Sequence, residues 1–594
     1  NAVGLEKVTT QTGYNICYSK ETINGNVCEV ATLGIPVAKI GLRYFKTVQN
    51  AFDFVEDNTQ TKVDIVKTHT TNSIGTVSSG KIIILDLNGN TITATNGITN
   101  NGTLVFRDTT GGGAVTSSNS AVTNNGVFKV QSGKIITTGE DHTIINNSEL
   151  TVSGGTVISG TSGQSLGTSV HTIYSKTQGA TTIISGGTIQ NYRPNGYTIN
   201  IQEADSTLTI SSATITSVYR GIYISSNVVL TMNSGTITVN GSNKRSADQH
   251  PMGIRINSAS AKAYIKGGTI ECTDSLNGEN AKGICLDEGT LELGTDGGTP
   301  SVTSPTIMGT DFGVGTYTDT AGTDGGKTQT IKFYDGKLVG KVAINAVGLE
   351  KVTTQTGYNI CYSKETINGT SYEVATLGKP VCKIGNRYYT NLQDAIDYAG
   401  TNTSTITMLK NVNLQTTVAT ISSNQNIKLD LSGYTLNSSS GSTIVNKGSL
   451  QITSSGSTGG KINNTSTSNI AIIENSGTLN LSNQTMVTEN GRGILTTSGT
   501  VKIAGTSITS KYATVHITGA STVNISNGAT ITSNDTIGVV DESTTGTTTV
   551  NINTATINAG THGIKANIAK VNITAVEINA GAYGILVGDN ATLT

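Results

Sequence analysis

A short strand motif recurs along the chain and limits the folds that it can adopt. In the C-terminal half its copies read GSLQI (448–452), GTLNL (477–481), GTVKI (499–503), STVNI (521–525), TTVNI (548–552) and KVNI (570–573). The central apolar residues are Leu450, Leu479, Val501, Val523, Val550 and Val571, at spacings of 29, 22, 22, 27 and 21 residues. Self-similarity at a period of about 20–50 residues is typical of solenoids and related repeat architectures.

Two further short strands lie between successive copies of the motif. GATIT (528–532) is an example of the second strand, and GVV (538–540) is an example of the third. The N-terminal half has the same order, with SATI (212–215) followed by GIYI (221–224). Three strands per repeat predict a three-faced parallel β-solenoid whose coils stack about 4.8 Å apart. Alternate residues would then form apolar ladders inside, and Gly would mark the corners.

An array of immunoglobulin-type sandwiches is the alternative all-β fold. That fold favours a Trp or aromatic core and turn signals about every 8–12 residues, whereas this sequence has no Trp and one recurring motif. Only 13% of the residues are charged, and Ile, Val and Thr are plentiful, which favours strands over disorder. The solenoid is therefore the preferred interpretation.

A second, longer repeat divides the chain into domains. Asn345–Gly369 copies Asn1–Gly25 letter for letter, at an offset of 345 − 1 = 344 residues. Such identity indicates the recent duplication of a whole domain within a tandem array. We expect a β connector (1–45), a cap helix with a first solenoid (46–343), a second connector (344–389), and a cap helix with a second solenoid truncated within a coil (390–594).

The connectors predict a hairpin followed by a short helix. Asn24-Gly25 suits the tight turn of a β-hairpin, and Thr47 and Asn391 suit helix N-caps. Apolar residues then follow a helical spacing at Val48, Ala51, Phe52 and Val55, and at Leu392, Ala395, Ile396 and Ala399. Because a solenoid needs end caps, we expect the second helix to cover the strand around Leu429 and Leu431.

The six cysteines leave two interpretations open. One is a disulfide in each connector, Cys17 with Cys28 and Cys361 with Cys382, and a third between Cys272 and Cys285. The other is that all six are unpaired small apolar residues. Spacing alone does not decide connectivity.

Several longer motifs point to a known family. They are the cap YYTNLQDAIDYA (388–399), the strands LDLSGYTL (429–436) and LDLNGNTI (85–92), the GTLxI and SGGTI coil motifs, and FYDGKLVGK (333–341) before the second connector. The chain resembles the pectate-lyase-like, right-handed parallel β-helix repeats of very large Gram-positive bacterial surface proteins. The resemblance implies an all-β fold of tandem right-handed β-helix units and a secreted or cell-surface-anchored, extracellular location. Such arrays are thought to serve as adhesive or spacing stalks, with neighbouring repeat units as partners.

A carbohydrate-active enzyme is an alternative, since β-helix folds also carry polysaccharide lyases and hydrolases. Hydrolysis needs two carboxylates across a bound sugar, and the candidates are Asp287-Glu288 and Asp541-Glu542. Both pairs follow a third strand, where neighbouring residues point in opposite directions, so we interpret them as solvated corners. We therefore predict no catalytic residues and no enzyme activity.

Charge and hydropathy also bear on ligands. A net charge of −1 gives no electrostatic case for nucleic acid, and no apolar run approaches the roughly 20 residues of a membrane helix. We predict no cofactor and no metal site, although weak Ca²⁺ binding by Asp311, Asp319 and Asp324 stays open.

One group of side chains predicts a glycan-binding patch. These residues precede or enter the third strand of successive coils, so that stacking would bring them onto one flank: Tyr192, Arg193, Tyr197, Tyr219, Arg220, Tyr223, Lys244, Arg245, His250 and Arg255. Tyr rings suit sugar faces, and Arg supplies fixed donors to hydroxyls or carboxylates. The alternative is that they are solubilising side chains on a neutral wall.

We therefore predict a structural fibre or adhesin stalk that has glycan or host-surface binding as an added role. Enzyme activity is the first alternative. Ice binding is another, through the Thr-x-Thr rows Thr214–Thr216, Thr236–Thr238 and Thr530–Thr532. The uneven coil lengths argue against ice binding.

Overall fold

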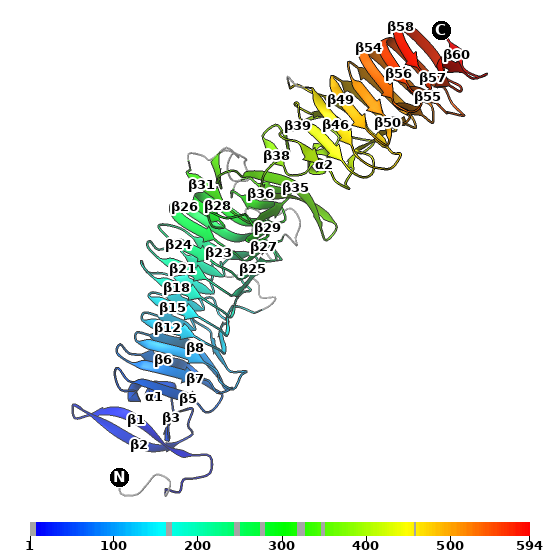
Figure 1. Cartoon of the computed structure of the whole chain (residues 1–594). Helices are drawn as coiled ribbons and strands as arrows, with labels where there is room; N and C mark the ends of the chain where they lie inside the picture. The colour runs from blue at the N-terminus through cyan, green and yellow to red at the C-terminus, as the bar shows by residue number, and fades with distance from the viewer. Residues whose placement is uncertain are drawn as a thin grey trace. The chain divides into compact units, whose positions relative to one another are not determined.

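The computed structural model describes residues 8–161, 169–242, 250–273, 280–317, 327–345, 351–456 and 459–594. It forms two compact units: unit 1 contains Asn1–Thr356 and Glu365–Leu377, and unit 2 contains Gly357–Lys364 and Gly378–Thr594. Within each unit, short strands lie side by side in ladders (Figure 1). Each unit is a parallel β-solenoid, as predicted.

The first strands of unit 1 pair in parallel from coil to coil. They are β5 (Gln60–Ile65), β7 (Ile82–Asp86), β9 (Thr103–Arg107), β12 (Val127–Val130), β15 (Glu149–Val152), β18 (Thr181–Ile184), β21 (Thr207–Ile210), β24 (Val229–Met232), the second parts of β26 (Met252–Ile265) and β28 (Lys282–Leu293), and β31 (Gln329–Phe333).

The second strands of unit 1 form another parallel ladder. They are the first parts of β6 (His69–Val77) and β8 (Thr91–Asn100), then β10 (Ala114–Ser117), β13 (Lys134–Thr137), β16 (Thr156–Ser159), β19 (Thr188–Asn191), β22 (Thr214–Ser217), β25 (Thr236–Val239), β27 (Thr269–Cys272), β29 (Thr306–Gly309) and β32 (Lys337–Gly340).

The third strands complete the wall of unit 1. They are the second parts of β6 and β8, then β11 (Val122–Asn124), β14 (Ile144–Asn146), β17 (Ile173–Ser175), β20 (Ile199–Ile201), β23 (Arg220–Ile224), the first parts of β26 and β28, β30 (Phe312–Gly315) and β33 (Val342–Ile344).

Unit 2 repeats the three ladders. Its first strands are β39 (Ser404–Met408), β42 (Asn426–Asp430), β45 (Ser449–Thr453), β48 (Thr478–Ser482), β51 (Gly499–Ala504), β60 (Thr592–Leu593) and the first parts of β54 (Ser521–Ser533), β56 (Thr549–Ala559) and β58 (Lys570–Ala580). Its second strands are β40 (Val412–Asn413), β43 (Thr435–Ser438), β46 (Gly460–Asn464), β49 (Gln484–Thr488), β52 (Ser507–Ser510) and the second parts of β54, β56 and β58. Its third strands are β41 (Ala419–Ile421), β44 (Ile444–Asn446), β47 (Ala471–Asn475), β50 (Arg492–Thr496), β53 (Val515–Ile517), β55 (Val539–Asp541), β57 (His562–Ala566) and β59 (Tyr583–Val587).

The predicted apolar ladder of unit 2 is confirmed rung by rung. Leu450 pairs with Leu479, and the register continues through Val501, Val523, Val550 and Val571 in parallel strands. All six side chains are buried. Coil lengths between 21 and 29 residues leave this register unchanged, so the extra residues lie outside the ladder.

Buried asparagines form a second internal ladder in unit 1. Asn100 Nδ2 donates to Asn124 Oδ1 at 2.8 Å, and Asn124 Nδ2 donates to Asn146 Oδ1 at 2.8 Å. In unit 2, Asn446 Nδ2 donates to Asn475 Oδ1 at 2.7 Å. A primary amide offers both donors and an acceptor, so each side chain continues the row and also bonds the backbone at the corner.

Glycine is required at one corner of unit 1 by close backbone approach. Gly155 and Gly187 have φ of 75° and 79°. A Cβ at either residue would lie 2.7 Å from the carbonyl oxygen of the glycine one coil earlier, Gly133 or Gly155. This stack confirms the prediction that glycine marks corners.

A short helix covers the start of each solenoid, as predicted. α1 (Val48–Phe54) begins after Thr47, whose Oγ1 accepts from Asn50 N at 3.1 Å. α2 (Leu392–Ala399) begins after Asn391, whose Oδ1 accepts from Gln393 N at 2.8 Å. The apolar residues that follow a helical spacing in α2, Leu392, Ala395, Ile396 and Ala399, are all buried. Two of them, Leu392 and Ile396, line the same small internal space as Leu429 and Leu450.

The first connector begins with a hairpin. β1 (Asn15–Ile23) pairs antiparallel with β2 (Asn26–Gly34) around Asn24 and Gly25, whose φ values of 51° and 80° fit the predicted tight turn. β3 (Ala38–Ile40) and β4 (Arg43–Phe45) follow it, and β3 also pairs with β5.

The second connector contributes strands to both units. In unit 1, β34 (Val352–Thr354) pairs in parallel with β31, and β36 (Thr370–Gly378) pairs antiparallel with β32. In unit 2, β38 (Arg387–Tyr389) pairs with β35 (Asn359–Ile367) through Tyr388 and Cys361, and with β37 (Cys382–Ile384). The end of the first solenoid is thus closed by strands of the connector.

Candidate functional site

One flank of unit 1 carries histidine, tyrosine and arginine side chains that contact one another from coil to coil. They occupy two positions of the third strands, the residue two places before the inward-facing Ile and the outward-facing residue directly after it. Together with Asp287 and Tyr317 we call them the aromatic ladder: His142, His171, Tyr174, Tyr197, Arg220, Tyr223, Arg255, Asp287 and Tyr317.

Two histidines begin the aromatic ladder. The rings of His142 and His171 are stacked, with centroids 4.9 Å apart and an angle of 8° between their planes. His171 N donates to His142 Nδ1 at 3.0 Å, and Tyr197 N donates to His171 Nδ1 at 3.0 Å. His171 is buried, and this burial, helped by nearby His142 and Arg220, lowers its pKa to about 3. The ring is therefore neutral at physiological pH.

Neutrality fixes the tautomer of His171. A neutral imidazole carries one N–H, and Nδ1 already accepts from the backbone of Tyr197. Nε2 must then carry the hydrogen and donate to the Asn200 amide group 2.7 Å away. The structure places Asn200 Nδ2 at this distance and leaves Oδ1 buried without a partner. Exchanging the two amide atoms lets the oxygen accept from Nε2. The histidine thus joins its own coil to the next one, which carries both Tyr197 and Asn200, by directed hydrogen bonds.

Tyr197 and Arg220 form the buried middle of the aromatic ladder. The Arg220 guanidinium lies 5.4 Å from the Tyr197 ring centroid and 5.8 Å from that of Tyr219. Tyr197 also packs against Tyr223, with centroids 5.0 Å apart. Arg220 is 8% exposed, and cation–π contacts gain strength when they are removed from water. Burial raises the pKa of the Tyr197 hydroxyl, so Tyr197 is neutral beside the cation.

Arg255 is the best-fixed cation of the ladder. Its guanidinium lies 4.4 Å from the Tyr317 ring centroid and 5.9 Å from that of Tyr223. Its Nε donates to Asp287 Oδ2 at 2.8 Å, and Tyr317 N donates to Asp287 Oδ1 at 2.8 Å. The Arg255 side chain is 19% exposed, whereas that of Asp287 is 3% exposed. The ladder therefore presents one edge of a guanidinium between two tyrosine rings.

The structure brings together four predicted patch residues: Tyr197, Arg220, Tyr223 and Arg255. His250 joins their edge, because its ring lies 5.5 Å from that of Tyr317. Arg193 lies elsewhere and is buried, with Nη2 donating to Thr138 O at 2.9 Å and also to Gly139 O. It braces the backbone between coils.

The other predicted patch residues do not join this edge. Tyr219 is fully buried. Tyr192 lines a separate hollow of about 240 Å³, together with Thr216 and Asn240. Lys244 and Arg245 lie outside the described residues.

The interpretation of the acidic pairs as solvated corners is wrong for the first residue of each pair. Asp287 is 3% exposed and Asp541 is 2% exposed. Asp287 holds Arg255 and Tyr317. Asp541 Oδ2 accepts from the backbone N–H groups of Asn567, Ile568 and Ala569 at 2.8–3.0 Å. Both carboxylates therefore pin the following coil.

All six cysteines are thiols in this structure, so none of the three disulfides that the sequence left open is present. In the β1–β2 hairpin, Cys28 faces Glu21, four residues along the strand from Cys17. Four residues span about 13 Å in a strand, beyond the roughly 7 Å limit for a disulfide. Cys272 packs instead with Val239 and Ala281. Cys361 and Cys382 are both buried, and burial raises the pKa of each thiol to about 12.

Of the three acidic residues considered for weak Ca²⁺ binding, Asp311 lies within the described residues. This carboxylate accepts from Ala281 N at 2.9 Å and from Lys341 Nζ at 2.7 Å. Asp319 and Asp324 lie outside the described residues. Among the residues that the structure describes, no group of three or more His, Cys, Asp or Glu side chains could hold a metal ion.

Of the two threonine rows in unit 1 behind the ice-binding alternative, one is long and one is short. The row of Thr214 and Thr236 runs over successive coils from Thr156 to Thr306. Thr214 and Thr216 pair with Thr236 and Thr238 on the next coil. The row of Thr216 and Thr238 is the short one, because Gln190 interrupts it on one side and Glu271 on the other. In unit 2, the counterpart of Thr532 on the next coil is Asn558.

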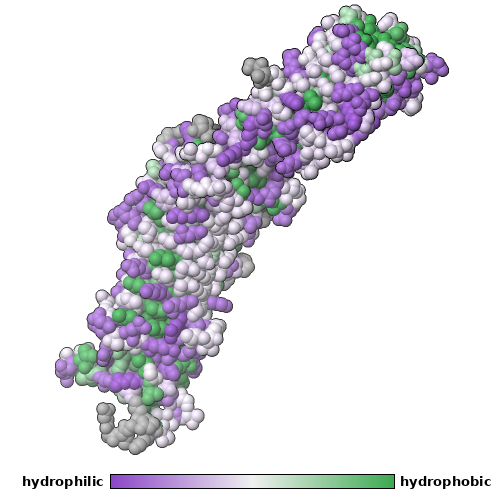
Figure 2. All heavy atoms as spheres, in the orientation of Figure 1, coloured by the Kyte–Doolittle hydropathy of each residue, from purple (hydrophilic) through white to green (hydrophobic). Residues whose placement is uncertain are grey.

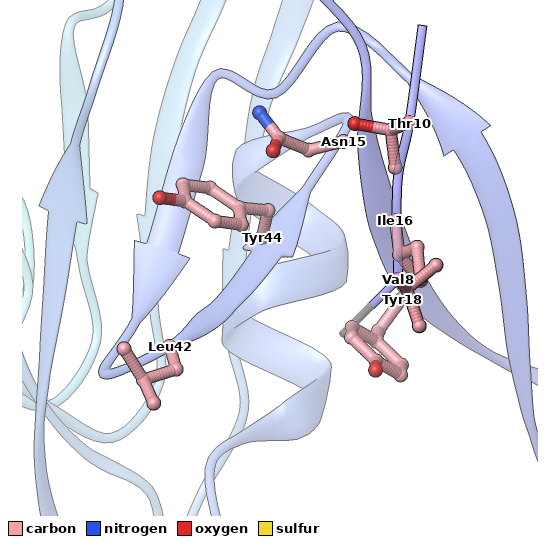
Figure 3. A pocket seen from close by; sticks show the side chains of 7 residues that line it. All are labelled: Val8, Thr10, Asn15, Ile16, Tyr18, Leu42 and Tyr44. Atoms are coloured by element: carbon pink, nitrogen blue, oxygen red, sulfur yellow. The ribbon is translucent and has the colours of Figure 1, made fainter. Parts of the chain in front are cut away.

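The residues of the first connector line a hollow, whose side chains Figure 3 shows. It has a volume of about 220 Å³ and is lined by Val8, Thr10, Asn15, Ile16, Tyr18, Leu42 and Tyr44. In the second connector the counterparts of Val8 and Thr10 are Val352 and Thr354, which belong to the paired strand β34. We therefore assign no small ligand to this hollow.

The sequence carried a signal for the histidines that the predicted patch omitted. HTIIN (142–146), HTIYS (171–175) and YTINI (197–201) are the same pentapeptide position on successive coils. The first residue of each pentapeptide carries one of the neighbouring rings. An alignment of the third strands would therefore have placed His142 and His171 at the same position of the repeat as Tyr197.

No family model, curated protein or solved structure matches this chain. Within the described residues, neither helix has the length and apolar character that crossing a membrane requires.

Proposed function

We propose that the chain is a structural segment of a repetitive extracellular fibre, acting as a spacer or adhesin stalk at a bacterial cell surface. The observation that carries the proposal is the apolar ladder of unit 2, which keeps one register from Leu450 to Val571 although coil length varies. A wall of this kind tolerates insertions at its corners while its interior stays continuous. The resemblance to surface-protein repeats supports the location.

The direction of the hydrogen bonds supports a mechanical role. In a parallel solenoid the interstrand hydrogen bonds run between coils, along the stacking direction. A pull along that direction therefore loads three ladders of backbone bonds at once. The asparagine ladder adds side-chain bonds along the same direction.

Single-molecule force spectroscopy tests this role on the full chain tethered at its two ends. We expect discrete unfolding events in which one coil of 22 residues (499 to 521) releases about 75 Å, at roughly 3.4 Å per residue. Smooth extension at the low forces that stretch an unfolded polypeptide would contradict the proposed role as a stalk.

An assay of polymer turnover separates the stalk from the enzyme alternative. We expect purified protein to release neither unsaturated nor reducing ends from pectin or alginate. Release that is lost in Arg220→Ala or Arg255→Ala would establish an enzyme instead.

Glycan binding is a second candidate function, favoured by the fixed edge of Arg255 between Tyr223 and Tyr317. Guanidinium donors and ring faces suit acidic sugars. Binding of uronate oligosaccharides, measured by calorimetry, should weaken at least about tenfold in Arg255→Gln, the loss of one charge-assisted contact. Lys565→Gln is the matched control, because Lys565 has the same third-strand position in unit 2. Equal affinity of the two variants would exclude this site.

A further inference from the structure

The first connector has a free sheet edge, and the corresponding strand of the second connector is paired in unit 1. β2 pairs with β1 along one edge, and among the described strands no other partner pairs with it. Residues 29–34 read EVATLG, and residues 373–378 read EVATLG as well. The second copy lies in β36, where it pairs antiparallel with β32 at the end of the first solenoid.

The register of that pairing defines what the free edge would bind. Leu338 pairs with Ala375, and Val339 pairs with Val374. Val339, Tyr372 and Val374 form a buried apolar cluster. Two acidic side chains add to the joint: Glu373 Oε1 accepts from Ala343 N at 3.0 Å, and Glu365 pairs with Lys337. Their counterparts Glu29 and Glu21 are both retained in the first connector.

Burial differs sharply between the two copies. Leu377 is 3% exposed and Ala375 is fully buried, whereas Leu33 is 55% exposed and Ala31 is also exposed. Ile23, Val27, Ile35 and Leu42 are exposed around Leu33, and Figure 2 shows hydrophobic atoms at the surface of this hairpin. A bare apolar edge strand is an aggregation liability that folded proteins usually cover.

A second segment of the connector shows the same contrast. Val352–Thr354 is strand β34 and adds a rung to β31. The identical residues VTT at 8–10 form no strand in the first connector. Both segments that close the end of the first solenoid therefore recur, without that partner, at the first connector.

We propose that the free edge of β2, with residues 8–10, is a docking surface for the end of another solenoid unit that is a second copy of unit 1. The occupant is the coil that corresponds to residues 329–344. By the observed register its strand would place its Leu338 opposite Ala31 and its Val339 opposite Val30. The surface is thus one half of a joint between units.

A lengthened chain tests the proposal directly. One further copy of residues 1–344 is placed before Asn1 of the full chain, so that Ile344 precedes Asn1 just as it precedes Asn345 in the natural sequence. The outer copy carries Cys28→Ser, which gives its β2 peptides a different mass. Hydrogen exchange then reports on the outer and internal connectors in one molecule.

We expect the backbone amides of residues 29–33 to exchange at least about 100-fold more slowly in the internal connector than in the outer one, since pairing and burial protect them. Val30→Asp in the internal connector should abolish the difference, because its counterpart Val374 is buried. Val27→Asp is the matched control and should preserve it, because its counterpart Ser371 is exposed.

Peptides that run from β1 through residue 28 carry the same mass difference, so the exchange of their β1 amides shows for each connector whether the hairpin itself is folded. Equal exchange of the two β2 strands, with β1 protected in both, would overturn the proposal and assign the edge to a partner of another kind or to none.

Discussion

At the scale of single residues, fully buried polar side chains join coils alongside the apolar ladder. Asn124 receives a hydrogen bond from Asn100 and donates both to Asn146 and, at 2.9 Å, to Glu149 O. A buried group that loses its partner costs about 1–3 kcal/mol. The internal asparagines should therefore be much less tolerant of substitution than asparagines on the outer surface.

Asn124→Ala should lower the unfolding free energy of its coil by about 2–3 kcal/mol. Asn125→Ala is the control, because Asn125 is the neighbouring exposed residue in an outer row, accepting from Asn147 at 2.7 Å and donating to Asn101 at 2.8 Å. It should cost less than about 1 kcal/mol, since water replaces exposed bonds. Hydrogen exchange of the amides in β12 and β15 measures the unfolding free energy of both variants. Equal losses of unfolding free energy would contradict the distinction between internal and outer asparagines.

The stability of unit 1 should depend on the protonation of His171. The folded pKa is about 3, and the unfolded pKa is about 6.5. Below pH 6.5 the unfolded chain binds a proton that the folded chain excludes, so stability is complete above that pH and falls as the pH drops toward 3. The slope is about 1.4 kcal/mol per pH unit.

From pH 7 to pH 5 the wild-type protein should therefore lose about 2 kcal/mol more than His171→Gln. The local unfolding free energy comes from hydrogen exchange of β17 and β20. His69→Gln, which changes a partly exposed histidine of the same unit, should keep the wild-type pH dependence. An unchanged dependence in His171→Gln would show that the buried ring does not control it.

At the scale of elements, each cap helix should protect only its own solenoid. Phe52 and Ile396 occupy the same place, since 396 − 52 = 344, and both are buried. Replacing either by Asp loses about 1.5–3 kcal/mol of apolar burial and adds a buried charge, while contacts in a solenoid are mostly between neighbours.

Ile396→Asp should speed limited proteolysis near residues 390–440 and leave unit 1 unchanged, and Phe52→Asp should have the opposite pattern. Each variant is thus the control for the other. Cleavage no faster than in the parent near the altered helix would mean that the helix is not a cap.

Elements governed by local rules were predictable from the sequence, and those governed by distant partners were not. Thr47, Asn391 and the Asn24-Gly25 turn act through residues next to them, and the inner valines follow a simple repeat. Asp541 is different, because its backbone donors come from residues 567–569 on the next coil. From the sequence alone, an adjacent Asp-Glu pair is therefore interpreted as a solvent-exposed corner, although the first carboxylate of the pair is buried.

The same limit applies to the candidate site. Tyr197, Arg220, Tyr223 and Arg255 were predicted to share a flank, because coil stacking follows from the repeat. Spacing does not show that Arg193 turns inward to bond Thr138 O, or that Asp287 fixes Arg255. Those contacts depend on how corners of unequal length fold over the wall.

At the scale of the whole molecule, each solenoid should shorten in whole coils only. The segment 499–520 is one complete coil, bounded by Gly499 and its register partner Ser521. Its removal would let Leu479 pair with Val523, and a solenoid stays stable when equivalent neighbours meet. We expect this deletion to keep the β-sheet signal in circular dichroism and the exchange protection of β54.

Removal of 499–509 is the control, because it deletes one strand and part of another and leaves the third strand in place. This deletion should abolish the protection of β54. Survival of both deletions, or of neither, would show that register between coils does not govern the fold.

The six-residue segment shared by the two connectors affects how such a gene can change in length. Recombination between the two copies of the connector adds or removes 344 codons and recreates the same junction. Since residues 29–34 and 373–378 are the same, the strand residues at the new junction between units are unchanged by such an event. The length of the encoded protein can then vary between lineages in steps of one whole unit. The residues at each junction between units stay the same, so natural selection on these contacts is unaffected.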